Sequence, residues 1–197
     1  MASLCSMILQ GLRDHTPHIA YAMLPKLLDA LNRIDDKYDT TPEFWKTPTS
    51  EQRCLWNVFL CIRAKVHHLI IILVNFTEEL AELDNPFKGY IFDQRIRSIT
   101  VVRLLSQEVL QSVTRMISLG GAPRHREMSW GDKLKEAFCL ARLIDMSSAT
   151  GWQRRQAGDL FHGLIQDLGV SSSLLVDSST QCIPQGATRL PPELLQD

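Results

Sequence analysis

The stretch "LWNVFLCIRAKVHHLIIILVNF", Leu55 to Phe76, decides the fold. Apolar residues recur in it at steps of four and three, which is the spacing of one face of an α-helix. Residues 70–72 and 74 make its middle apolar all round, as in a helix buried by its neighbours. We therefore predict a central helix from Glu51 to Leu83, about 50 Å long at 1.5 Å per residue. The alternative is a coiled-coil seam for self-association, formed by Leu55, Phe59, Ile62, Val66, Leu69 and Leu73.

The rest of the chain also predicts helices. Thr16 and Pro17 begin one that ends near Lys37, with a kink or break at Pro25. Another covers residues 93–119, and Gly169 ends a last one that begins near Trp152. Ser129 caps a helix whose predicted core residues are Leu134, Phe138, Ala141 and Ile144.

The predicted fold class is all-α, a single-domain bundle of five or six helices around one long central helix. The helical domain covers 1–169, and the Ser- and Pro-rich segment 170–197 is predicted to be a flexible tail. With 197 residues the chain has enough material for one core.

Cysteine usage and hydropathy bear on the location of the protein. The five cysteines are odd in number and form no C-x-x-C pair, which is typical of reduced thiols in an intracellular protein, cytoplasmic or nuclear. The start of the chain has no signal-peptide pattern. The strongest apolar run, 69–76, is much shorter than the roughly 20 residues that a spanning helix needs, so we expect no membrane span.

The acidic stretch "RIDDKYD", residues 33–39, is the main candidate for chemistry. Asp35, Asp36 and Asp39 have the D-D-x-x-D spacing that holds magnesium against a diphosphate in terpene cyclases and prenyl transferases. Carboxylate oxygens suit magnesium, which shares its ligands with substrate phosphates. The competing interpretation is a solvated helix end, and it is favoured because no matching second metal motif follows in the sequence.

Basic and aromatic residues are the candidates for partner binding. Residues 88–158 hold 12 Lys/Arg against 6 Asp/Glu, while the chain as a whole has a net charge of -1. No nucleic-acid-reading motif occurs, so direct binding of nucleic acid is not expected. The predicted protein-binding residues are Phe44, Trp45, Arg95, Arg97 and Arg103.

Three stretches, Leu55–Phe76, Asp84–Gly120 and Leu134–Gly169, together resemble the helical regulatory region of fungal-specific transcription factors. The shared features are a long Leu/Ile helix with a central histidine, then "RSI" at residues 97–99, then the W-x-R-R segment "WQRR" at 152–155. Those factors bind DNA through a six-cysteine zinc cluster, whereas this chain has five scattered cysteines. The resemblance implies a regulatory piece without its DNA-binding module.

Two functions follow as hypotheses. The first is a non-catalytic helical regulatory or interaction domain, linked to transcriptional control, with no cofactor. The second is a small helical enzyme or lipophilic-ligand binder that uses magnesium at Asp35, Asp36 and Asp39. The sequence lacks a nucleophile elbow, a P-loop and a dinucleotide-binding motif, so the first hypothesis is preferred.

Overall fold

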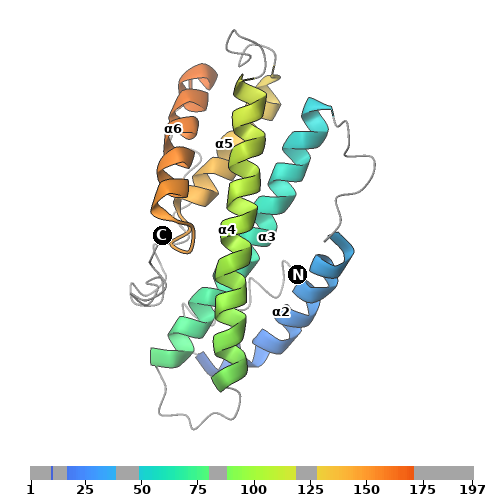
Figure 1. The fold of residues 1–197 in the computed structure, drawn as a ribbon, viewed down its shortest axis with the longest axis vertical. Helices are drawn as coiled ribbons and strands as arrows, with labels where there is room; N and C mark the ends of the chain where they lie inside the picture. The colour runs from blue at the N-terminus through green and yellow to red at the C-terminus, as the bar shows by residue number, and fades with distance from the viewer. Residues whose placement is uncertain (1–9, 11–16, 39–48, 80–87, 119–127, 171–197) are drawn as a thin grey trace.

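The computed structural model describes residues 10, 17–38, 49–79, 88–118 and 128–170, and it confirms the all-α fold class (Figure 1). These ranges contain five helices and no strand. The helices are α2 (Pro17–Tyr38), α3 (Ser50–Glu79), α4 (Lys88–Ser118), α5 (Trp130–Ile144) and α6 (Gly151–Leu168). Pro25 lies inside α2 without dividing it into two helices.

The ends of three helices follow from local side-chain hydrogen bonds. Thr49 and Gln52 cap α3 reciprocally, because Thr49 N–H donates to Gln52 Oε1 at 2.8 Å and Gln52 N–H donates to Thr49 Oγ1 at 3.2 Å. Thr150 and Gln153 form the same capping box at α6. Ser129 accepts from the Asp132 N–H at the start of α5, as predicted. Gly169 ends α6 with a φ of 65°, a left-handed conformation that favours glycine.

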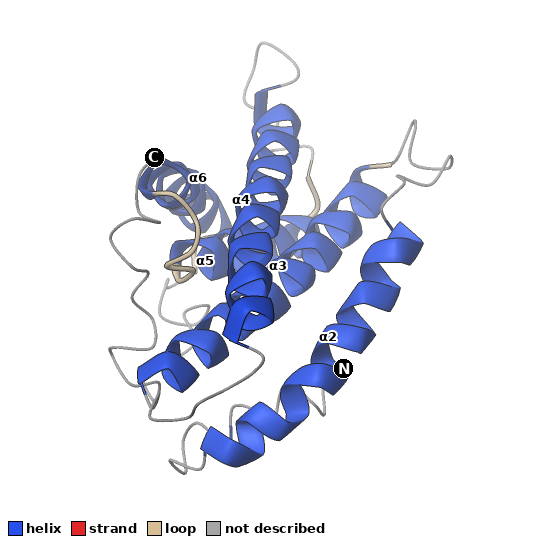
Figure 2. Ribbon diagram, turned by 60° about the horizontal axis from the view of Figure 1, so that its bottom comes forward, coloured by secondary structure: helices blue, strands red, loops and turns tan. Residues whose placement is uncertain are grey.

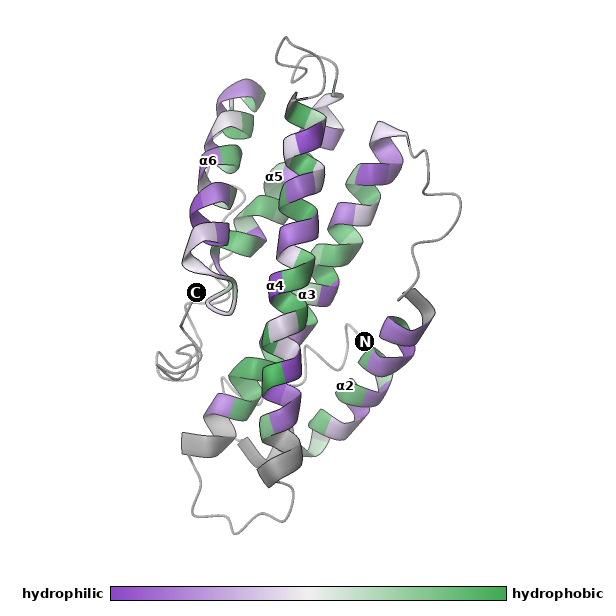
Figure 3. Cartoon of the chain, viewed as in Figure 1, coloured by the Kyte–Doolittle hydropathy of each residue, from purple (hydrophilic) through white to green (hydrophobic). Residues whose placement is uncertain are grey.

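Helices α3 and α4 pack along each other in the middle of the molecule (Figures 1 and 2). The hairpin of α5 and α6 lies on one side of them, and α2 lies on the other. The hydrophobic side of α6 faces this centre and its hydrophilic side faces outward (Figure 3). The core therefore forms around α3, whose residues 69–75 are all buried.

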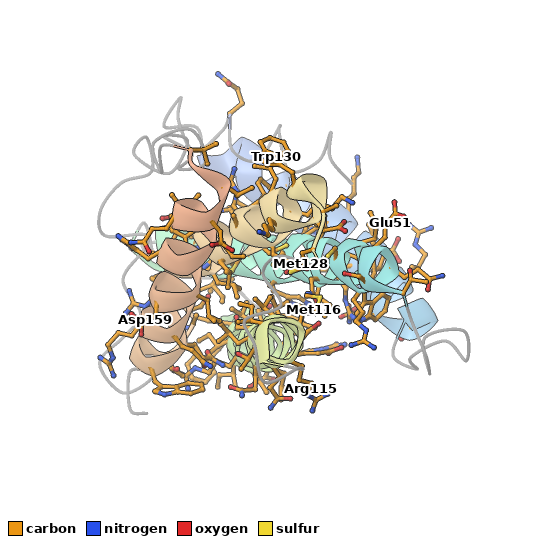
Figure 4. All side chains as sticks on the ribbon, turned by 90° about the horizontal axis from the view of Figure 1, so that it is seen from above. Glu51, Arg115, Met116, Met128, Trp130 and Asp159 are labelled. Carbon is orange, nitrogen blue, oxygen red and sulfur yellow. The ribbon has the colours of Figure 1, made fainter. Side chains whose placement is uncertain are left out.

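Length and composition alone would let Ser50–Asn75 cross a membrane. However, 78% of its most apolar window is buried inside the bundle, as expected of a core helix. One end of the bundle is closed by Met116 from α4 and Met128 before α5, both buried, whereas Trp130 projects outward (Figure 4).

The predicted inward face of α5 is wrong in part. Leu134, Phe138 and Ile144 are only half-buried, and of the four predicted core residues Ala141 alone is buried. Large apolar residues guided the prediction, but the buried face of α5 is built on small and polar side chains as well. It consists of Asp132, Glu136, Ala137, Cys139, Leu140, Ala141 and Leu143.

Candidate functional site

Four polar side chains from three helices meet where α2 packs on α3. This Asp35 cluster consists of Asp35 from α2, Arg63 and His67 from α3, and Ser98 from α4. Arg63 donates to Asp35 Oδ1 from Nη2 at 2.7 Å and from Nε at 3.2 Å. His67 Nε2 lies 3.5 Å from Asp35 Oδ2, and His67 Nδ1 lies 3.2 Å from Ser98 Oγ. All four residues are buried, so the cluster joins the three helices internally.

The environment of Asp35 favours its charged form. Burial alone would raise the pKa of its carboxyl group, but His67 and Arg63 together bring the pKa below its ordinary value of 3.8. The Arg63 contact is the stronger by geometry, because 3.5 Å is too long for a good hydrogen bond from His67. Asp35 is therefore an ionised anchor that holds α2 against a cation of α3.

The cluster has the serine, histidine and aspartate of a nucleophilic triad, but not its accessibility. In a triad the serine oxygen must reach a substrate carbonyl. Ser98 is 1% exposed and His67 is 2% exposed, so a substrate has no access to the serine oxygen in this structure. The arrangement connects helices, because Arg63 of α3 donates to Asp35 of α2 and His67 Nδ1 of α3 lies 3.2 Å from Ser98 Oγ of α4.

The predicted magnesium ligands are separated by their environments. Asp35 is buried and paired with Arg63, whereas Asp36 is exposed, and Asp39 lies outside the described residues. Within the described ranges, no three His, Cys, Asp or Glu side chains lie close enough together to hold a metal ion. Magnesium binding stays a prediction, and it would require Asp35 to exchange Arg63 for the metal.

The predicted basic partner surface is divided between the core and the exterior. Arg95 is buried, 3.4 Å from Asn75 Oδ1 and 5.0 Å from the centre of the Phe92 ring. Arg97 is exposed and Arg103 is half-buried, so the three arginines do not form one exposed stripe. The connector aromatics, Phe44 and Trp45, lie outside the described residues.

A second polar cluster lies between α3 and α5. Glu136 and Asn57 both have 0% exposure, and Asn57 Nδ2 donates to the two carboxylate oxygens at 3.0 Å each. Burial raises the pKa of Glu136 to about 7, although hydrogen bonds with Cys54 and Asn57 oppose the rise. Nearby, Cys61 Sγ lies 3.7 Å from the Cys139 carbonyl oxygen. We call Glu136, Asn57 and Cys54 the Glu136 cluster; it places a buried carboxyl group in an interface that also contains the thiol of Cys61.

The adjacent histidines His67 and His68 serve different interfaces, because consecutive side chains on a helix point in different directions. His68 Nδ1 lies 2.9 Å from Ser148 Oγ, in the turn between α5 and α6. Burial, together with the nearby Lys65 charge, lowers the pKa of His68 to about 3. His68 is therefore a neutral core residue near pH 7.

Sequence reasoning missed the partners of Asp35 and the role of Glu136. The face of α2 that carries Leu24, Leu28 and Leu31 continues in helical steps to Asp35, and that pattern alone indicates an inward carboxylate. In α5 the buried Leu143 and Leu140 lead to Glu136 in the same helical steps, but the predicted face was drawn through Leu134, Phe138, Ala141 and Ile144.

The exposed apolar groups are the other candidate site. Leu55 and Ile62 are each 51% exposed, and Phe59 lies between them on the same side of α3. We call these three residues the α3 face. Phe59 stacks on Trp56 with ring centres 5.1 Å apart, and Trp56 Nε1 donates to Glu108 Oε1 of α4 at 3.2 Å. The other residues of the predicted seam, Val66, Leu69 and Leu73, are buried in the bundle.

No family model matches this sequence, and no curated protein or solved structure matches it either.

Proposed function

We propose that the chain is a non-catalytic helical interaction domain in which the α3 face binds an apolar segment of a protein partner. The observation that carries the proposal is the exposure of Leu55 and Ile62, seven residues apart on one helix. Apolar side chains that share one face can be buried together by a single partner helix.

The polar groups support a non-catalytic role. Asp35, His67 and Ser98 are buried and contact one another or Arg63, and Glu136 is buried against Asn57. These groups connect helices instead of facing a substrate. In the described residues, the large apolar side chains that reach solvent include the α3 face and a few others, namely Phe92, Ile96, Leu104, Trp130 and Trp152.

The α3 face is rigid enough to recognise a partner. The Trp56–Phe59 stack and the bond from Trp56 to Glu108 fix its flank against α4. Burying the exposed half of Leu55 and of Ile62 would yield about 1 kcal/mol for each side chain, since full burial yields about 1.5–3 kcal/mol. Together they would strengthen binding by roughly 30-fold.

The partner is a protein, and the role is regulatory, including transcriptional control as the resemblance to fungal-specific transcription factors implies. A second copy of the chain is one possible partner, through Leu55, Phe59 and Ile62 only. Light scattering that finds a monomer at high concentration would exclude that partner and leave a different protein.

The test uses a photo-cross-linking amino acid at position 62, with the same amino acid at Leu104 as the control. Leu104 lies on α4 and is 64% exposed, so it matches Ile62 in chemistry and accessibility. We expect a discrete cross-linked protein from position 62 that position 104 does not give. The same adducts from both positions, or none from position 62, would contradict the proposal.

A further inference from the structure

In the part of the chain that the structure describes, no cation forms an ion pair with the Glu136 carboxyl group. It lies on α5, has no exposed surface, and receives its hydrogen bonds from the neutral amide of Asn57 and the thiol of Cys54. Neutral donors stabilise a buried carboxylate much less than an ion pair does. Ionisation of Glu136 in the folded chain therefore has a large free-energy cost.

The charges around Glu136 are already engaged elsewhere. Lys135 Nζ contacts Asp132 Oδ1 at 3.1 Å on α5 itself, and Asp132 adds a like charge one turn before Glu136. From α6, Asp167 contacts Lys133 at 3.2 Å. From α3 the facing titratable group is Cys54, and Cys139 is the next titratable group along α5. These surroundings favour a neutral Glu136.

The side chain of Asn57 is placed to hydrogen-bond with a protonated Glu136 carboxyl group. Its Nδ2 donates to both carboxylate oxygens, while its Oδ1 is buried and accepts no hydrogen bond from the described residues. A protonated carboxyl group has an O–H donor, and a small rotation of the amide would let Asn57 Oδ1 accept it while Nδ2 still donates to the other oxygen. Proton uptake thus satisfies an acceptor that the ionised form leaves without a partner.

We propose that the α3–α5 interface is a proton-dependent switch, closed when Glu136 holds a proton and prone to open when Glu136 releases it to solvent. Opening separates the α5–α6 hairpin from α3, because the two helices of the hairpin pack on each other and Glu136 faces α3. The proposal does not depend on the function of the α3 face.

The switch would work near neutral pH. The pKa of Glu136 is about 7 in the closed bundle, against an ordinary value of 4.5 for a solvated glutamate. The closed state therefore binds the proton more tightly than the open state does. Its population is highest at low pH, and it falls as the pH rises through about 7.

Three cysteines in the α3–α5 interface can report its opening through their reaction with a thiol reagent. Cys54, Cys61 and Cys139 are free and buried. Burial, followed by the Glu136 charge, raises the pKa of Cys54, and contact with Cys61, followed by burial, raises that of Cys139. In the closed bundle all three thiols are inaccessible, and the raised pKa values keep those of Cys54 and Cys139 protonated, so iodoacetamide reaches the cysteines only after opening.

The experiment compares iodoacetamide labelling of the native full chain and of Glu136→Gln at about pH 5.5 and about pH 8, read for each cysteine by mass spectrometry. The ratio of the two proteins' rates cancels the pH dependence of the thiol reaction. With pKa values of about 7 closed and 4.5 open, that ratio should rise about 30-fold between these pH values. Glu51→Gln, a change at an exposed glutamate of α3, should leave labelling as in the native chain.

A ratio that stays constant within about threefold would overturn the proposal. A second measurement needs no variant to fold: the carbon-13 shift of the Glu136 carboxyl group in the native chain is titrated by NMR. A midpoint near pH 7 supports the switch, and a midpoint near the ordinary glutamate value of 4.5 overturns it.

Discussion

Replacing Asp35 with asparagine tests whether one carboxylate holds α2 on the bundle. The substitution keeps the size of the side chain and one acceptor oxygen but removes the charge. Arg63 then stays buried without its counter-ion, because its hydrogen bonds at 2.7 Å and 3.2 Å both end on Asp35 Oδ1. His67 loses its carboxylate neighbour at 3.5 Å as well.

The expected loss follows from the burial of the pair. Breaking a fully buried ion pair by removing one partner costs about 3–5 kcal/mol. The side chains of Arg63 and Asp35 keep 10% and 11% of their exposure, so water screens the pair slightly. We expect Asp35→Asn to lower the free energy of unfolding by about 2–4 kcal/mol, with α2 opening before the rest of the bundle.

Urea unfolding measures the total loss, and hydrogen exchange by mass spectrometry locates it. Exchange should accelerate in α2, which is held on α3 by Asp35 and by the buried Leu24, Leu27, Leu28 and Leu31. A double-mutant cycle with Arg63→Met isolates the pair and cancels the loss of the Arg63 contact with Phe59, 5.9 Å from the ring centre. The coupling energy should be about 2 kcal/mol or more.

The matched control is Asp36→Asn, the same change at the neighbouring exposed aspartate, which should change stability by no more than about 0.5 kcal/mol. The stability that Asp35 contributes should be complete above its ordinary pKa of 3.8 and lost as the pH falls through its lowered folded pKa. Equal effects of Asp35→Asn and Asp36→Asn, with no coupling to Arg63, would refute the idea of an ionic anchor.

Three further predictions concern other parts of the molecule. Glu136→Gln should raise the free energy of unfolding by about 3 kcal/mol at pH 8 and by little near pH 4.5. The reason is that the pKa of Glu136 is about 7 in the folded chain against an ordinary 4.5, and each pKa unit corresponds to about 1.4 kcal/mol. Urea titrations at both pH values measure the change. Gln153→Ala should cost about 1–3 kcal/mol in the same assay, since Gln153 completes the cap of α6 and donates to the Arg103 carbonyl at 2.8 Å. Magnesium with pyrophosphate should leave the thermal midpoint unchanged in the native chain and in Asp36→Asn; a rise in the native chain alone would favour the metal site.

The central helix could be predicted because its signal is local. The apolar steps from Leu55 onward are a property of consecutive residues, and burial of residues 69–74 follows from an apolar run that no single face can contain. The structure describes α3 as far as Glu79, and its predicted end at Leu83 lies outside the described residues. Ser129 and Gly169 gave accurate boundaries, because caps depend on residues next to the helix.

The polar clusters could not be predicted because they join residues far apart in the sequence. Asn57 and Glu136 are 79 positions apart, and Asp35 and Arg63 are 28 apart. Their contacts depend on the rotation of each helix about its axis, which periodicity gives only approximately. A modest rotation of α5 moves Leu134 and Phe138 toward its edge and places Glu136 inside, and the sequence contains no apolar side chain at that position to reveal it.

The rotation of each helix about its axis also decides which of the predicted partner-binding residues are exposed. Arg95 and Arg97 are close in sequence, but their side chains point to different sides of α4, so one is buried and the other is exposed. Of the predicted seam of α3, the second half (Val66, Leu69 and Leu73) is buried in the bundle, whereas Leu55 and Ile62 in the first half are exposed. What the spacing could not indicate was which half of the helix the bundle would leave exposed.

The most direct test of the interaction domain is the affinity of the full chain for the protein that cross-links to position 62. Titration calorimetry would compare the native chain with Leu55→Ser/Ile62→Ser and with Leu104→Ser, after circular dichroism has shown all three to be folded. The α3 face predicts binding about 10- to 30-fold weaker for the double variant, and binding within about twofold of the native value for Leu104→Ser. Equal affinities for the native chain and the double variant would contradict the account.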